Sequence, residues 1–188
     1  MSLAKRKGHN MNYRQAVDNA TQDLNPNNDY QLQLNTTAGI ILLDLWYHLA
    51  PEHCKSIIGL TRIGYHNNTI IHRIIPNFII QMGSPNPDGT GHTDYTIHQE
   101  LHHKLHQPGV LAMARADGKP HSASSQFYIC LNDAPHLDHH YTTFGKTANT
   151  ESLELAKQIA TAPTDKNNRP RSPVTITTAI IIVHEIPT

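Results

Sequence analysis

Residues 71–83 read Ile71-His72-Arg73-Ile74-Ile75-Pro76-Asn77-Phe78-Ile79-Ile80-Gln81-Met82-Gly83. Two short apolar runs flank a Pro-Asn pair, and such a pair is typical of a turn between strands. If the turn closes a β-hairpin, Arg73 lies near Phe78, Ile79 and Gln81 on the returning strand. The hairpin then offers a cation and an amide beside an apolar surface. The alternative is an ordinary hairpin whose arginine extends into water.

The rest of the chain predicts a mostly β fold. Tyr30, Leu32 and Leu34 alternate with polar residues, which is the period of a strand, and 40–47 returns as an apolar run. Helical spacing occurs only at 51–64 and 151–162, and the layout is typical of a closed barrel or sandwich with helical caps. Further short apolar segments, separated by turn residues, cover 69–75, 78–82, 110–114, 126–131, 141–144 and 174–186.

The length of 188 residues suits one domain with a short extension. We assign 29–188 to the domain and 1–28 to a polar N-terminal arm, loose except for one weak helical turn near 11–20. Cys54 and Cys130 lie among apolar neighbours and are interpreted as buried thiols.

Charge and hydropathy exclude several classes of protein. Fifteen Lys plus Arg balance fifteen Asp plus Glu, so a strongly basic nucleic-acid binder is excluded. No apolar run is long enough for a membrane span, and no apolar segment follows the basic N-terminal residues as in a secretory signal. We therefore expect a cytoplasmic monomer that binds neither nucleic acid nor membranes. Fifteen histidines predict that stability depends on pH.

Four blocks of the chain resemble the cyclophilin family, in the family's order. Residues 71–83 are similar to its signature, in which Phe-His-Arg precedes a proline turn, a Phe and Gln-x-Gly-Asp. The resemblance implies a closed eight-stranded antiparallel barrel capped by two α-helices, with peptidyl-prolyl cis–trans isomerase activity. The other blocks are Gly109-Val110-Leu111-Ala112-Met113-Ala114-Arg115, Ser124-Ser125-Gln126-Phe127-Tyr128-Ile129-Cys130, and Leu137-Asp138 with Phe144-Gly145-Lys146.

The implied reaction suits these residue types. Rotation about a peptide bond faces a barrier of about 18–20 kcal/mol, because the nitrogen lone pair is delocalised into the carbonyl. A guanidinium that donates toward the prolyl nitrogen keeps the lone pair out of conjugation while a dry pocket grips the ring. No covalent bond breaks, so no nucleophile, metal or cofactor is needed. The expected partners are proline-containing peptides and unfolded proteins.

The resemblance also implies a role for each position. Arg73 is the catalytic cation, Gln81 steers the substrate carbonyl, and Phe78 belongs to the proline pocket. Tyr141 occupies the place of a pocket histidine in many eukaryotic members. The remaining substrate-binding candidates are Ile79, Ala114, Arg115, Gln126, Tyr128, His136 and Leu137.

Some residues depart from the family pattern. Ile71 replaces a Phe, and Met82-Gly83-Ser84 replaces Gly-Gly-Asp. Tyr128 replaces a Phe, so its hydroxyl needs a buried partner or a water. His136 stands where many eukaryotic members carry a cyclosporin-binding Trp, which predicts weak inhibition by that drug. The segment 116–123 is longer than in compact members.

Two alternatives remain. One is a cyclophilin-like module that binds proline peptides but has lost its isomerase activity. The other is a His-rich metal-binding protein, because three imidazoles on one helix face could hold zinc, copper or nickel. Its candidate ligands are His98, His102 and His106, with His103 adjoining, and a second group of His136, His139 and His140.

Overall fold

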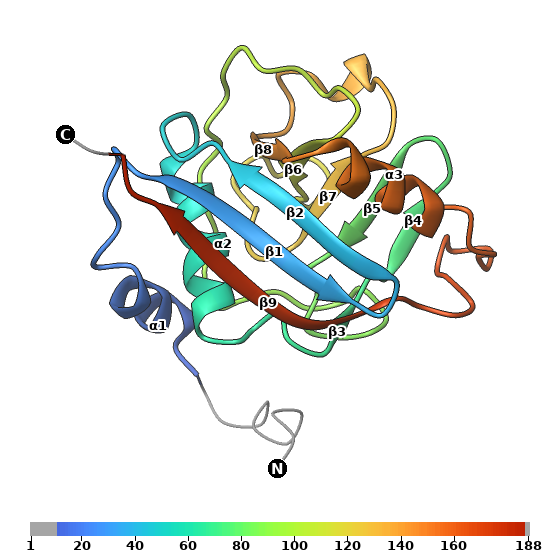
Figure 1. The fold of residues 1–188 in the computed structure, drawn as a ribbon, viewed down its shortest axis with the longest axis horizontal. Coiled ribbons are helices and arrows are strands. Elements are labelled where there is room, and N and C mark those ends of the chain that lie inside the picture. The colour runs from blue at the N-terminus through green and yellow to red at the C-terminus, as the bar shows by residue number, and fades with distance from the viewer. Residues whose placement is uncertain (1–10, 187–188) are drawn as a thin grey trace.

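The computed structural model describes residues 11–186, in which strands dominate (Figure 1). Within this range no helix is both long and apolar enough to cross a membrane. The helices are α1 (Tyr13–Ala20), α2 (Pro51–Arg62) and α3 (Thr150–Ile159), with a 3-10 turn η2 at Pro135–Leu137. The strands are β1 (Asp29–Thr36), β2 (Gly39–Leu45), β3 (Thr69–Ile70), β4 (Arg73–Ile75), β5 (Ile79–Met82), β6 (Val110–Met113), β7 (Phe127–Cys130), β8 (Thr143–Thr147) and β9 (Thr175–His184).

The strands form one nine-stranded antiparallel sheet in the order β3-β9-β1-β2-β8-β6-β7-β5-β4. The mostly β class is therefore confirmed, but the expected closed eight-stranded barrel is wrong. The apolar segment 69–75 does not form one strand, because it changes partner at Ile71-His72. β3 pairs with β9, β4 pairs with β5, and these two end strands do not pair with each other.

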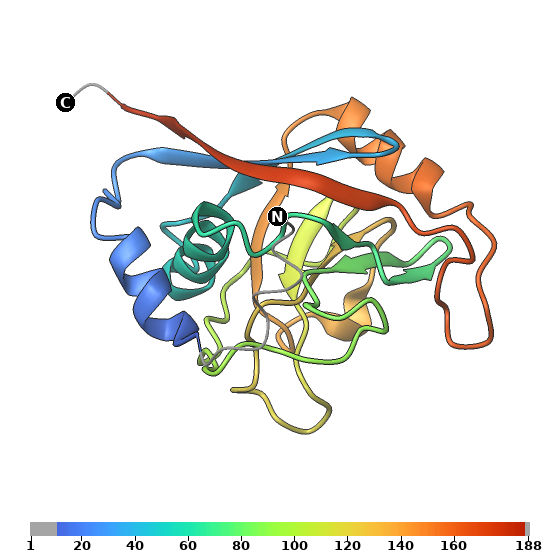
Figure 2. The same ribbon diagram turned by 90° about the horizontal axis from the view of Figure 1, so that it is seen from below.

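The β1–β2 hairpin follows the predicted alternation. Tyr30, Leu32 and Leu34 are at most 2% exposed and face the core, where they lie opposite Leu45, Leu43 and Ile41. β9 pairs along the other edge of β1, and Figure 2 shows these strands as a layer above α1 and α2. Cys54 and Cys130 are both fully buried, as their apolar neighbours predict.

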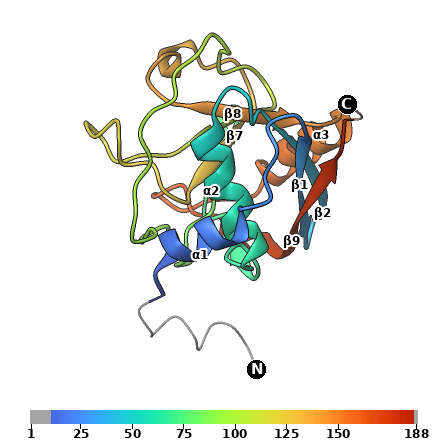
Figure 3. The ribbon, with the colours of Figure 1, turned by 90° about the vertical axis from the view of Figure 1, so that its left-hand side faces the viewer.

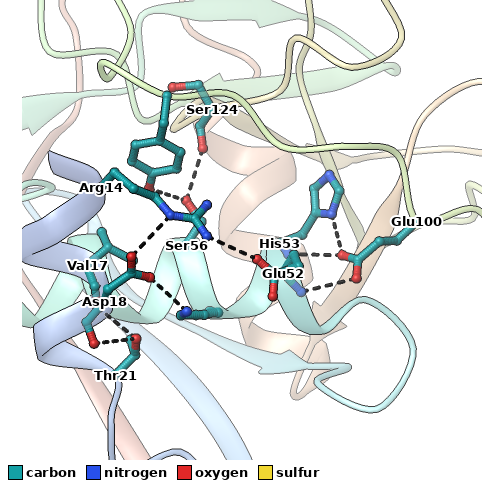
Figure 4. A network of polar contacts seen from close by, with 11 residues as sticks. Arg14, Val17, Asp18, Thr21, Glu52, His53, Ser56, Glu100 and Ser124 are labelled. Atoms are coloured by element: carbon teal, nitrogen blue, oxygen red, sulfur yellow. Dashed lines mark hydrogen bonds and ion pairs between the residues drawn. The ribbon is translucent and has the colours of Figure 1, made fainter.

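Helix α2 packs against β9 and helix α3 against β2 and β8 (Figure 1), and both helices match the predicted segments. Pro51 begins α2, where its missing N–H costs nothing, but the preceding Ala50 has no side chain that could cap the helix. Glu100 supplies the cap from a distant loop. Its carboxylate accepts the backbone N–H groups of Glu52 at 3.1 Å and His53 at 3.0 Å, and it contacts His53 Nδ1 at 2.6 Å (Figure 4). The loop between β5 and β6 is thereby fixed to α2.

The described part of the N-terminal arm is not loose. Helix α1 packs across the lower end of α2 (Figure 3), where Val17 is 3% exposed and an added Cβ on Gly59 would lie only 2.7 Å from it. Asp18 pairs with Lys55 at 2.8 Å, near the Arg14 and Glu52 contacts drawn in Figure 4. The expected weak turn is thus a full helix, and α2 covers its apolar side.

Gly83, directly after β5, is a position where adding a single methyl group should lower the stability of the fold considerably. Its φ is +85°, and a Cβ there would lie 2.2 Å from the Ser125 carbonyl oxygen. We expect Gly83→Ala to lower the free energy of unfolding by about 2–3 kcal/mol, because left-handed strain adds to a backbone clash. Urea denaturation measures the change.

The matched control for this substitution is Gly118→Ala. Gly118 has φ +68° but no atom within 4 Å of the added Cβ, so only the strain of about 1 kcal/mol applies. Equal losses in the two variants would show that the contact with Ser125 does not matter.

Candidate active site

The hairpin predicted from residues 71–83 is present as β4 and β5. Asn77 occupies the turn with φ +57°, a conformation that Asn tolerates well, and Phe78 N–H donates to the Ile75 carbonyl at 3.0 Å. The resulting register places Arg73 directly opposite Gln81. Arg73 Nη1 donates to Gln81 Oε1 at 3.0 Å, so the half-buried guanidinium is oriented and does not extend freely into water.

A chain of amides supports this pair from behind. Gln81 Nε2 donates to Gln126 Oε1 at 3.0 Å, and Gln126 Nε2 donates to the carbonyls of Gly89 and Gly91, each at 3.0 Å. Because the glycine carbonyls can only accept, the Gln126 amide nitrogen must face them, and its oxygen faces Gln81. The Gln81 amide nitrogen then donates to that oxygen, which leaves the Gln81 oxygen to accept from Arg73. The amide orientations are therefore set in sequence, and the arginine is held at the end of the series.

An apolar hollow adjoins the guanidinium. Ile79, Ala112, Tyr128 and Cys130 form its buried base, with the side chains of Ile75, Phe78, Ala114, Leu137 and Tyr141 packed against them. A cavity of about 320 Å³ opens above this base, which is within the size range of small-ligand sites. Its lining residues are Arg73, Phe78, Ile79, Gln81, Ala114, Arg115, Asp117, Tyr128, His136, Leu137 and Tyr141.

Two ring contacts form the rim of the cavity. The Phe78 and His136 rings lie 5.3 Å apart and 31° from parallel. The Arg115 guanidinium carbon lies 4.3 Å from the centre of the Tyr141 ring, close enough for a cation–π interaction, and Arg115 Nε donates to the His140 carbonyl at 3.2 Å. The side chain of Arg115, and not only its backbone, therefore shapes the site.

The structure brings ten of the eleven sequence candidates to this cavity, and Gln126 lines the neighbouring one. That second cavity, about 400 Å³, shares Gln81, Ala114 and Arg115 with the first and also contains Lys119 and Ser122. The two cavities therefore adjoin each other. The sequence reasoning missed Asp117, which lies in the lengthened loop that could not be placed by analogy.

Tyr128 has the buried hydroxyl partner that the sequence required. Its oxygen lies 3.3 Å from His106 Nε2, while His106 Nδ1 lies 2.8 Å from Asp138 Oδ1. No feature of the sequence pointed to this role of His106, because its spacing from His98 and His102 drew attention to a metal site instead.

The metal-binding alternative is not supported. Residues 98–106 form a loop and not the helix that would align three imidazoles. His98 stacks on His121 at 4.5 Å, His102 contacts the Thr143 carbonyl, and His106 lies beneath the cavity. Between residues 11 and 186, no three His, Cys, Asp or Glu side chains are grouped so as to hold a metal ion.

Comparison with known proteins agrees with the geometry. The family model for cyclophilin type peptidyl-prolyl cis-trans isomerases matches residues 31–181. The chain belongs to the cyclophilin family. It is an enzyme of the peptidyl-prolyl cis–trans isomerase class, as the sequence predicted.

Individual cyclophilins show how much of the chain the similarity covers. The peptidyl-prolyl cis-trans isomerase ppi1 of Schizosaccharomyces pombe is 37% identical over 158 residues, which are 80% of this chain and 98% of the relative. A peptidyl-prolyl cis-trans isomerase of Helicobacter pylori is 38% identical over 128 residues, which are 67% of this chain and 78% of the relative. A Cryptosporidium parvum cyclophilin crystallised in the presence of the dipeptide Ala-Pro has a TM-score of 0.74 and 32% identity. The match covers 81% of this chain and 98% of that protein.

Proposed function

We propose that the cavity beside Arg73 binds the proline ring of unfolded or flexible polypeptides and that Arg73 promotes rotation of the preceding peptide bond. The observation that carries the proposal is the oriented guanidinium at the edge of an apolar hollow. A proline ring in the hollow would contact Phe78 and Leu137, which are apolar and exclude water. The Cryptosporidium parvum cyclophilin, studied with Ala-Pro, supports a site for this dipeptide unit.

The proposed chemistry needs charge placement and positioning only. As the amide twists, its nitrogen becomes pyramidal and its lone pair becomes a hydrogen-bond acceptor, to which Arg73 donates. Uncatalysed X–Pro exchange takes tens to hundreds of seconds. Shortening ~100 s to ~10 ms corresponds to roughly 5.5 kcal/mol. A charge-assisted hydrogen bond contributes about 1.5–3 kcal/mol, so positioning by the hollow and by Gln81 supplies the remainder.

The positions of the other candidate residues in the two cavities support the roles proposed for them. Gln81 would contact the substrate carbonyl next to the guanidinium. Ala114 and Arg115 border both cavities, where the peptide backbone would pass. The proline ring would be enclosed by the remaining side chains of the first cavity, which are Phe78, Ile79, Tyr128, His136, Leu137 and Tyr141. In this proposal the enzyme assists protein folding in the cytoplasm as a monomer, as the sequence analysis expects.

The test is isomerisation of an Xaa-Pro peptide, followed by NMR exchange at equilibrium, together with the refolding of a protein limited by proline isomerisation. Catalytic amounts of the chain should accelerate both. Peptide binding with equal rates in the presence and absence of the chain would favour the inactive binding module.

Inhibition by cyclosporin provides a separate prediction about the rim. The exposed imidazole of His136, whose ring is tilted against that of Phe78, offers less apolar area than an indole. We expect inhibition weaker than nanomolar, and a gain of at least about tenfold, or ~1.4 kcal/mol, in His136→Trp. Inhibition constants of the two proteins check this. Nanomolar inhibition of the unchanged protein would refute it.

A further inference from the structure

A buried polar series lies directly beneath the proposed proline pocket. Tyr128, on β7, is 4% exposed, and its ring forms part of the base of the cavity. Its hydroxyl points to His106 Nε2 at 3.3 Å, and the two rings lie within 17° of parallel. His106, which is 2% exposed, contacts Asp138 Oδ1 through Nδ1 at 2.8 Å.

The hydrogen-bond roles in this series are determined by Asp138. The same Oδ1 also accepts the His106 backbone N–H at 2.7 Å. Burial acts to raise the pKa of Asp138, but these hydrogen bonds outweigh burial and lower it, so the carboxylate is ionised and only accepts. His106 Nδ1 therefore carries the proton, Nε2 is the acceptor, and the Tyr128 hydroxyl donates.

We propose that His106 is a positioning residue for the proline pocket, because it holds the Tyr128 hydroxyl away from the cavity and fixes the ring that contacts the proline. This inference rests on the proposed function. Without the acceptor, the hydroxyl would be buried and unpaired, and the Tyr128 ring, which lines the cavity, would have to shift to bring the hydroxyl to another partner or to water. With the acceptor, the tyrosine presents the same apolar face as a phenylalanine.

The hydrogen bond between the Tyr128 hydroxyl and His106 should be lost at acidic pH. A protonated imidazole has no acceptor, so protonation of His106 removes the partner of the Tyr128 hydroxyl. Burial lowers the pKa of His106, the hydrogen bond and charge of Asp138 raise it, and the nearby His136 and His139 lower it, with a net decrease. The ring of Tyr141 also packs edge-on against His106 at 6.5 Å. Pocket function should then decline on acidification below the ordinary histidine range.

A double-mutant cycle on the full chain tests the coupling. The variants are His106→Leu, Tyr128→Phe and the pair together, with kcat/KM from NMR exchange and the dissociation constant of an Ala-Pro-containing peptide from NMR titration. His106→Leu should weaken peptide binding roughly tenfold when Tyr128 is present, since it leaves the hydroxyl unpaired. In the Tyr128→Phe background the same substitution should have an effect at least fivefold smaller. Equal effects in both backgrounds would overturn the proposal.

The pH profile distinguishes positioning from a merely structural role. Between pH 5 and 8, peptide affinity and kcat/KM of the unchanged chain should fall on the acid side with one inflection below pH 6.5. That inflection should be absent in Tyr128→Phe, with circular dichroism confirming a native fold at every pH. An inflection that persists in Tyr128→Phe contradicts the inference. Because the affinity measurement does not need turnover, an inactive chain would refute the proposed function while the cycle in affinity still decides the role of His106.

Discussion

Arg73→Ala should reduce kcat/KM for an Xaa-Pro peptide about a hundredfold, or roughly 2.7 kcal/mol. In the proposed mechanism the substitution removes the donor to the prolyl nitrogen, whereas the hollow lined by Phe78 and Leu137 remains. Peptide affinity should therefore change less than kcat. Arg73→Lys should give an intermediate rate, because it keeps the charge but loses the planar guanidinium that Gln81 orients.

Arg171→Ala is the matched control for the loss of an arginine. Arg171 is exposed and lies outside both cavities, so its removal should leave the rate unchanged. If Arg73→Ala is as active as the unchanged chain, the catalytic role given to Arg73 is wrong. If the unchanged chain binds the peptide without accelerating its isomerisation, the inactive binding module is the correct interpretation.

Mild acid should destabilise the fold through two buried histidines. Burial lowers the pKa of His66 to about 4, and burial is also the main cause that lowers the pKa of His72 to about 4. His66 is fully buried, with Thr61 Oγ1 3.0 Å from its Nδ1 and no partner for Nε2 among the described residues. The folded protein therefore keeps His66 neutral at a pH where the unfolded chain is already protonated.

The direction and size of the change in stability with pH follow from the difference in histidine pKa between the folded and the unfolded state. Between pH 6.5 and 4 the unfolded state binds a proton that the folded state does not, so the free energy of unfolding falls as the pH falls. Each of the two histidines lowers the free energy of unfolding by about 1.4 kcal/mol per pH unit in this range. By pH 4 the loss from each histidine is about 3 kcal/mol. Urea denaturation at pH 7.5 and 4.5 measures the loss.

His66→Asn isolates one of these contributions. The asparagine can keep a hydrogen bond to Thr61 but cannot titrate, so the difference in stability between the two pH values should shrink by about 2–3 kcal/mol. A difference as large as in the unchanged chain would mean that His66 is not responsible, and that carboxylates with lowered pKa, such as Glu100, dominate acid unfolding.

Local patterns predicted much of the fold. The alternation of Tyr30, Leu32 and Leu34 gave the strand and its buried face, and Pro51 with the helical spacing behind it gave the start of α2. The Pro-Asn turn gave the hairpin that sets Arg73 opposite Gln81. In each case the signal lies within a few residues of the structure it predicts.

The remaining features depend on contacts between distant segments. The segment 69–75 is split because β3 pairs with β9 and β4 pairs with β5, and α1 buries Val17 against α2. Glu100 caps a helix 48 residues away, and His106 meets Tyr128 from 22 residues away. Spacing along the chain instead suggested that His106 belonged with His98 and His102. The candidate residues came from the family resemblance, which carries such distant contacts implicitly.

The two end strands of the sheet, β3 and β4, contain two and three residues and follow each other along the chain. An unpaired strand edge is a template on which a foreign extended segment can add, and long flat edges lead to aggregation. At β3 and β4 a foreign segment would find only two or three residues to pair with. β9 is different, because it pairs with β3 only at Thr175 and Ile176, and beyond them it has no strand partner on that side among the described residues. The short strands at the two ends of the sheet therefore limit the backbone on which another chain could add, and the outer side of β9 is where such an addition would have to begin.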